Sequence, residues 1–121
     1  MTREQYLKPI LDAVPGADAS AFDGWTVIPG FVDGQHVATA IVNGTEIHFA
    51  LVPEFRHTAM LRQRAQEFIA PLLKQWGFLT TRVPLAERGK QRFVERVGFR
   101  QTWADEQFQY YLLGQLPFAR R

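Results

Sequence analysis

Residues 35–52 read QHVATAIVNGTEIHFALV and carry the strongest local signal in the chain. Two β-rich stretches flank the Asn-Gly dipeptide at 43–44, and Asp-Gly at 33–34 separates them from a third stretch at residues 25–32. Both dipeptides tolerate the positive φ angles that two-residue hairpin turns require. Two such turns in succession predict a three-stranded antiparallel sheet.

The same stretch predicts which side chains share a face of this sheet. If Asn43-Gly44 is a two-residue loop, Val42 pairs with Thr45, and Thr39 then pairs with His48. Because side chains alternate along a strand, Glu46 and His48 share one face. The other face is then apolar and consists of Ala38, Ala40, Ile47, Phe49 and Leu51.

Helical spacing precedes and follows the predicted sheet. Thr2 and Gln5 have the spacing of a capping box, and Pro9 predicts a kink or a late start of the first helix. A long helix is expected over 57–76, with a polar face that includes Gln66 and an apolar stripe that ends at Trp76. The rest is expected to form a strand at 78–83, a helix at 85–97 closed by Gly98, and a hairpin at 100–113.

Composition limits the class of protein. The 121 residues suit one domain, which we divide into an N-terminal helix and loop (1–24), a core (25–113) and a tail (114–121). The absence of cysteine excludes disulfides and thiolate chemistry. His36, His48 and His57 fall on separate elements without ligand spacing, so we expect no metal. Without a long apolar run or a secretion signal, we expect a protein that does not enter a membrane and that is cytoplasmic, or virion-associated if a phage encodes it.

Charge is unevenly distributed along the chain. Residues 1–55 carry two basic and seven acidic side chains, whereas residues 56–121 carry twelve basic and five acidic ones. Such asymmetry indicates either an anionic ligand on the second half, attraction between the halves, or solvated helix faces. The expected helix at 85–97 is the most basic segment, but no aromatic residues alternate with its arginines as stacking platforms, so nucleic acid is not an expected partner.

Two motifs resemble the GNAT superfamily of acyl-CoA-dependent N-acyltransferases. Residues 51–56, LVPEFR, are similar to the end of that family's fourth strand and its Pro-x-x-Arg or Gln turn. Residues 92–99, RFVERVGF, are similar to its F-Y-E-K-x-G-F segment. The resemblance covers about residues 25–113. It implies an α/β fold with a mostly antiparallel, twisted sheet, helices on both faces and the order α-β-β-β-α-β-α-β-β.

The resemblance also implies where acetyl-CoA would bind. In the family, a glycine-rich loop after the fourth strand holds the pyrophosphate of the coenzyme on bare N–H groups at a helix N-terminus. Residues 56–61 contain no glycine, so we expect weakened coenzyme binding. The matching positions are Val52, Arg56, His57, Thr58, Ala59, Met60, Leu61 and Arg62.

Two further departures concern proton transfer. Val94 stands where many family members have a tyrosine that acts as general acid, and Glu87 stands where an asparagine often opens the motif. Candidates for the general base are Glu46, His48 and Glu54. The alternative for Glu46 is a structural residue that borders a turn. The alternative for His48 is a partly exposed strand residue without a catalytic role. A third departure is length: about 24 residues precede the predicted sheet, too few to form the first strand and two helices that are usual in the family.

These features leave two functions open. The first is a GNAT-like protein with an eroded acetyl-CoA site that serves as a binding or assembly module, by analogy related to phage or prophage proteins. The second is an active acetyl-CoA-dependent N-acyltransferase. Aromatic residues in the last hairpin, among them Phe108, Tyr110 and Tyr111, would suit an interface, and we expect a homodimer or another protein partner.

Overall fold

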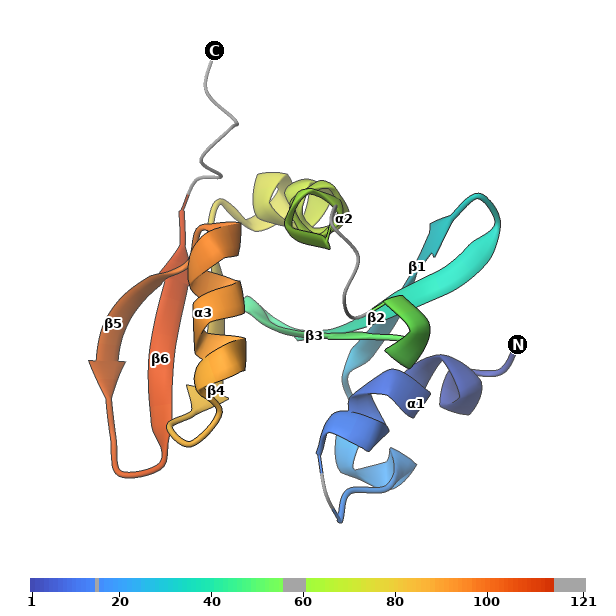
Figure 1. Cartoon of the computed structure of the whole chain (residues 1–121), viewed down its shortest axis with the longest axis horizontal. Coiled ribbons are helices and arrows are strands. Elements are labelled where there is room, and N and C mark those ends of the chain that lie inside the picture. The colour runs from blue at the N-terminus through green and yellow to red at the C-terminus, as the bar shows by residue number, and fades with distance from the viewer. Residues whose placement is uncertain (15, 56–60, 115–121) are drawn as a thin grey trace. The chain divides into compact units, whose positions relative to one another are not determined.

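The computed structural model describes residues 1–14, 16–55 and 61–114, and within the last range the side chains from residue 65 onward. These residues form six strands and three α-helices in the predicted order, a mixed α/β fold with mostly antiparallel strands (Figure 1). The chain divides into two compact units, Met1–Thr58 (unit 1) and Ala59–Arg121 (unit 2). None of the helices in the described part of the chain has the length and apolar character needed to span a bilayer.

Unit 1 begins with helix α1 (Arg3–Ala13), whose first turn confirms the predicted capping box. The Gln5 N–H donates to Thr2 Oγ1 at 3.2 Å, and the Thr2 N–H donates to Gln5 Oε1 at 2.7 Å. The two residues thereby satisfy donors that the helix itself leaves unpaired. Of the two alternatives predicted for Pro9, the late start was wrong, because the helix begins before Pro9 and continues through it; the kink stays a prediction.

The predicted three-stranded sheet is confirmed. Strands β1 (Thr26–Val32), β2 (Gln35–Asn43) and β3 (Glu46–Leu51) pair antiparallel in sequence order. The first turn is the predicted one: Asp33 and Gly34 have φ angles of 53° and 78°. Positive φ at both central residues is the signature of a turn whose twist matches that of the flanking strands.

The second turn lies one residue later than predicted. Asn43 pairs with Glu46, so the loop is Gly44-Thr45, with Gly44 at a φ of 63°. The predicted partner of His48 was therefore wrong: His48 lies opposite Ile41 and not Thr39. A shift of two positions in the pairing keeps every side chain on its predicted face, because the side-chain period of a strand is two.

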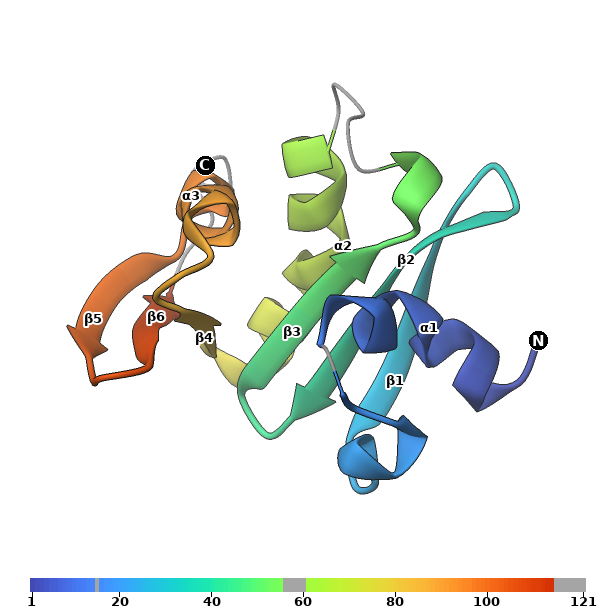
Figure 2. The same ribbon diagram turned by 60° about the horizontal axis from the view of Figure 1, so that its bottom comes forward.

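Helix α1 packs on the face of the sheet that carries Ile41 (Figure 2). Leu7, Ile10 and Ile41 form a buried cluster, and the buried Thr39 hydroxyl donates to the Tyr6 carbonyl at 2.5 Å. This hydrogen bond joins the middle of β2 to the helix. Partly buried residues complete the cluster: Leu11, Ala19, Phe22, Trp25, Val27 and Ala50.

Unit 2 contains three further strands, which pair antiparallel with one another. Its strands are β4 (Leu79–Pro84), β5 (Arg100–Ala104) and β6 (Phe108–Leu113), in the order β4-β6-β5. Helix α2 (Leu61–Trp76) precedes β4, and α3 (Arg88–Val97) follows it. As predicted, α3 closes at a glycine: Gly98 has a φ of 129°.

One face of the unit 2 strands is covered by α3. The buried residues Leu79, Thr81 and Val83 alternate along β4, and Tyr111 lies opposite Thr81 on the same face. The Tyr111 hydroxyl donates to Glu95 Oε2 of α3 at 2.8 Å. Burial of the phenol, reinforced by the Glu95 carboxylate, raises the pKa of Tyr111 to about 12.

Gln66 occupies an unexpected position in unit 2. Sequence periodicity places it on the polar face of α2, but its side chain is buried, and its Nε2 donates to the carbonyl of Val97 at 2.8 Å. That carbonyl ends α3 and lacks a partner within the helix. The apolar stripe also ends differently from the prediction, because Trp76 is 46% exposed.

Candidate active site

The candidate bases Glu46 and His48 lie on the face of the unit 1 sheet that α1 covers. Strand β3 begins with Glu46, and alternation puts this residue, His48 and Ala50 on one side and Ile47 on the other. The predicted face of both candidate residues is confirmed. Their neighbours on that face are the apolar residues that pack against α1.

The two side chains form a direct pair. His48 Nε2 lies 2.6 Å from Glu46 Oε2, and the two side chains are 29% and 31% exposed. An ionised carboxylate can only accept a hydrogen bond, so Nε2 of a neutral His48 carries the hydrogen. The lone pair of Nδ1 is then the basic position of the ring. This is the arrangement in which a carboxylate fixes the tautomer and orientation of a general base.

Trp25 packs against the imidazole. The ring centroids of Trp25 and His48 are 5.6 Å apart and the ring planes are tilted by 50°. Phe22 meets Trp25 edge-to-face, with the ring centroids 6.5 Å apart. Arg3 of α1 donates to the backbone carbonyls of Phe22 and Trp25 at 2.9 and 3.0 Å. The helix therefore fixes the loop that positions Trp25 beside His48.

Trp25 and Arg3 are parts of the site that sequence reasoning missed. The only signal for Trp25 was a large aromatic residue directly before the first strand. The guanidinium of Arg3 gives no sequence signal, because its partners are backbone carbonyls 19 and 22 residues away. Only the folded chain brings these groups to one place.

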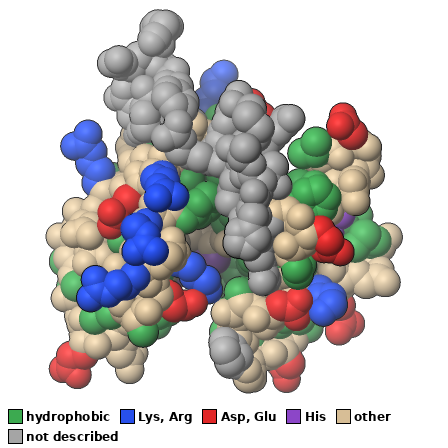
Figure 3. Space-filling view, viewed as in Figure 1, with side chains coloured by type: hydrophobic (Ala, Val, Ile, Leu, Met, Phe, Trp, Pro, Cys, Tyr) green, Lys and Arg blue, Asp and Glu red, His purple; other side chains and the backbone are tan. Residues whose placement is uncertain are grey.

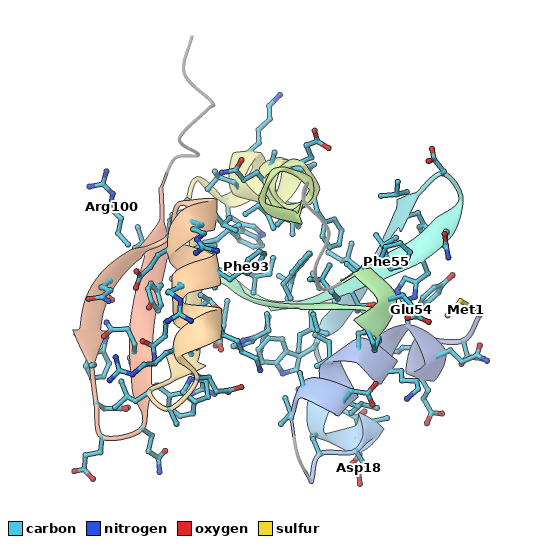
Figure 4. All side chains as sticks on the ribbon, in the orientation of Figure 1. Met1, Asp18, Glu54, Phe55, Phe93 and Arg100 are labelled. Atoms are coloured by element: carbon cyan, nitrogen blue, oxygen red, sulfur yellow. The ribbon has the colours of Figure 1, made fainter. Side chains whose placement is uncertain are left out.

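Glu54 lies on a separate element. It belongs to the short 3₁₀ turn Pro53–Phe55 after β3, and its side chain is exposed (Figure 4). Within the described residues, no hydrogen bond or ion pair connects it to Glu46 or His48. Of the three predicted bases, the structure brings two together.

The predicted coenzyme-binding residues are described only in part. Val52 is half-buried; its N–H donates to the Val37 carbonyl and its own carbonyl accepts from Phe55 N–H, both at 2.9 Å. The N–H of Val52 is thus already used within unit 1. Leu61 and Arg62 form the start of α2, where helix geometry leaves the first N–H groups unpaired. Five of the predicted residues lie outside the described part of the chain: Arg56, His57, Thr58, Ala59 and Met60.

The second motif lies on α3 and its C-terminal end. Glu87 precedes the helix, makes no side-chain cap, and pairs instead with Lys90 at 2.8 Å. Val94 is half-buried, and its carbonyl accepts from the N–H groups of Gly98 and Phe99. This closure explains why a Gly-Phe pair ends the motif. A valine side chain at position 94 has no proton to donate.

The described residues contain no group of three or more side chains suited to hold a metal ion. His36 is held by other contacts. Its Nε2 lies 2.9 Å from Thr39 Oγ1, and its ring packs edge-to-face on Tyr6 at 5.1 Å. Because the Thr39 hydroxyl donates its only hydrogen to the Tyr6 carbonyl, it accepts from His36, whose Nε2 is therefore protonated.

The chain has a GNAT-like fold, similar to that of solved N-acetyltransferases. A Bacillus subtilis acetyltransferase in complex with CoA matches 96% of this chain and 95% of its own, with a TM-score of 0.75 and 13% identity. Campylobacter jejuni N-acetyltransferase PseH in complex with acetyl coenzyme A matches 79% of this chain and 72% of its own, with a TM-score of 0.64 and 14% identity.

A third similar structure is a variant of the spermidine N-acetyltransferase SpeG from Vibrio cholerae. It matches 91% of this chain and 71% of its own, with a TM-score of 0.64 and 11% identity. No protein-family model and no curated protein sequence matches the chain. At these identities the likeness concerns the fold.

Proposed function

We propose that the chain is an N-acyltransferase that uses acyl-CoA and in which His48, oriented by Glu46, is the general base. The observation that carries this proposal is the 2.6 Å pair between His48 Nε2 and Glu46 Oε2 on β3. The fold supports it, because similar structures include acetyltransferases with CoA or acetyl-CoA bound. Partial exposure of both side chains leaves the pair accessible to an acceptor.

The chemistry of the pair follows from its hydrogen bond. An acceptor amine must lose a proton as its nitrogen attacks an acyl carbonyl, and Nδ1 of His48 can take that proton. The imidazolium formed is stabilised by the Glu46 carboxylate at Nε2. Acyl-CoA would supply the acyl group as an activated thioester, with the coenzyme thiolate as leaving group. With valine at position 94, solvent or another group must protonate that thiolate.

The test is acetyl transfer from acetyl-CoA to a panel of amines, measured by release of the free thiol. We expect His48→Gln to lower kcat about a hundredfold or more, because a general base contributes about 10²–10⁴. Glu46→Gln keeps an acceptor for the Nε2 hydrogen but removes the negative charge, so this variant should lose less kcat than His48→Gln. His36→Gln is the matched control and should keep wild-type kcat. Equal rates for wild type and His48→Gln would contradict the assignment.

A second candidate is a binding or assembly module with little or no acyl transfer, as in phage-related proteins of eroded function. Two sequence observations favour it: residues 56–61 contain no glycine, and Val94 replaces the acid. Calorimetric titration with acetyl-CoA separates the candidates. A Kd of about 10 μM or tighter, equivalent to about −7 kcal/mol, would contradict the module. On the module hypothesis, Leu61→Gly should improve coenzyme binding.

A further inference from the structure

The unit 2 sheet has a second face, opposite α3, that we call the Trp103 face. On β4, residues between the buried ones are more accessible, and Leu112 and Trp103 are 39% and 58% exposed. Strand pairing brings side chains from all three strands together on this face: Arg82, Arg100, Trp103, Phe108, Tyr110 and Leu112.

A β-bulge puts Trp103 on this face. Gln101 pairs with Tyr111, and regular pairing would then put Thr102 opposite Tyr110. The register instead shifts between Gln101 and Trp103, so that Trp103 lies opposite Tyr110. The extra residue reverses the side on which the indole emerges, which is a common consequence of a bulge. Without the bulge, Trp103 would belong to the face that α3 covers.

The aromatic residues of the face are fixed by contacts with one another. Trp103 and Tyr110 stack with centroids 4.4 Å apart and planes 3° from parallel, and Phe108 meets Tyr110 edge-to-face at 6.3 Å. The Tyr110 hydroxyl donates to Asp105 Oδ2 at 2.9 Å. The N–H groups of Gln107 and Phe108 donate to the other carboxylate oxygen at 2.8 and 2.7 Å. A platform held in this way loses little side-chain freedom on binding.

Positive charge borders the aromatic platform. The Arg82 guanidinium lies over the Phe108 ring at 4.8 Å, and Arg100 is exposed at the start of β5, pointing away from the hairpin (Figure 4). Basic side chains also gather over α3 (Figure 3), where Arg88, Arg92 and Arg96 are exposed. Because residues 59–121 of unit 2 carry six more basic than acidic side chains, a second copy of this unit would be repelled and a polyanion attracted.

We propose that the Trp103 face binds single-stranded nucleic acid. A base stacks on the exposed side of the Trp103 indole, and Arg100 and Arg82 contact the neighbouring phosphates. Stacking on aromatic side chains beside basic groups is the general mode of single-strand recognition, and RNA and DNA share this chemistry. The sequence pattern did not reveal this platform, because no aromatic residues alternate with the arginines of α3. The aromatic residues come from other segments, which the pairing of β4, β5 and β6 brings together.

The test is fluorescence anisotropy of labelled 12-nucleotide oligo(dT) and oligo(U) with the full chain at several salt concentrations. We expect binding at low salt that Trp103→Ala weakens at least tenfold and Trp103→Phe largely keeps. Trp76→Ala is the matched control, since Trp76 is also exposed but lies on α2, and it should bind like wild type. Arg100→Ala should weaken binding and reduce the slope of log K against log salt by about one.

Three results would overturn the proposal. One is the absence of binding to either oligonucleotide at about 50 mM salt. Another is wild-type affinity in Trp103→Ala together with a loss in Arg88→Ala or Arg92→Ala, which would indicate attraction by α3 charge alone. The third is a dimer in light scattering that Trp103→Ala converts to a monomer, which would make the face a self-association surface. Equal urea midpoints of all variants exclude unfolding as the cause.

Discussion

The three strands of unit 1 and the three strands of unit 2 differ in how they are buried. In β2 of unit 1, five successive residues, 38–42, are buried, whereas β4 of unit 2 alternates between buried and more accessible positions. Polar groups on the covered face of unit 1 have fixed partners, as Thr39 does with the Tyr6 carbonyl. On the Trp103 face, Arg100 points into solvent. Substitutions on the face that α1 covers should therefore change the free energy of unfolding, and those on the Trp103 face should change the binding of nucleic acid.

The largest expected effect tests this contrast directly. Ile41→Ala removes a side chain that is 1% exposed and packs against Leu7 and Ile10 of α1, so it should lower the free energy of unfolding by about 2–5 kcal/mol. Leu112→Ala, on the Trp103 face, should cost less than about 1 kcal/mol. Urea unfolding followed by circular dichroism measures both. Similar losses for the two variants would mean that the Trp103 face is packed like a core.

The covered face of unit 2 should have a pH-dependent stability at alkaline pH. The pKa of Tyr111 is raised to about 12 by burial and by Glu95, whereas tyrosine in an unfolded chain ionises near pH 10. The phenol stays neutral in the fold while it ionises in the unfolded chain. The contribution of Tyr111 to the stability of the fold is therefore complete below pH 10 and is lost as the pH rises through 12.

A shift of two pKa units corresponds to about 2–3 kcal/mol. Stability measured from pH 9 to 12 should fall more steeply for wild type than for Tyr111→Phe by this amount. The variant should be somewhat less stable at pH 8, because it lacks the hydrogen bond to Glu95. If the free energies of unfolding of wild type and Tyr111→Phe change in parallel with pH, Tyr111 has the same pKa in the folded and the unfolded chain.

The first sheet was predictable because local chemistry determines it. Side-chain alternation assigned the faces, and Asp33-Gly34 set the first turn as expected. The register of the second hairpin was not decided, since Asn43-Gly44 and Gly44-Thr45 both suit two-residue loops. The order of elements and the α/β fold class were predictable for the same reason: each segment shows its own period and its own stop signals.

The parts that could not be predicted depend on contacts between distant segments. Periodicity assigned Gln66 to solvent, because a sequence pattern does not reveal that the last carbonyl of α3 needs a donor. Strand alternation placed Glu46 and His48 on one face of the sheet. It could not predict that the Trp25 ring packs against His48. The Trp103 face depends on a bulge, which inserts one residue without a clear sequence signal.

Gln66 allows a sharper test of burial in unit 2. Gln66→Glu replaces the amide donor by an oxygen that faces the Val97 carbonyl, and it puts a carboxylate in a site that is 4% exposed. We expect a loss of about 1–3 kcal/mol, larger at pH 8 than at pH 5, because only the protonated acid can donate. Gln75→Glu, at an exposed position of the same helix, should change stability by less than about 0.5 kcal/mol. Equal effects of the two variants at both pH values would contradict the buried position of Gln66.

The smallest effect concerns the helix that covers the first sheet. Thr2→Ala removes the side-chain acceptor of the Gln5 N–H, and loss of such a cap costs about 1 kcal/mol. Thr2→Ser keeps the hydroxyl and should retain most of that stability. Because Tyr6 and Leu7 anchor α1 within the first two turns, the loss should appear in the urea midpoint of the whole unit and not only as fraying. If hydrogen exchange instead speeds up only at residues 3–6 while the midpoint is unchanged, the first turn does not contribute to covering the sheet.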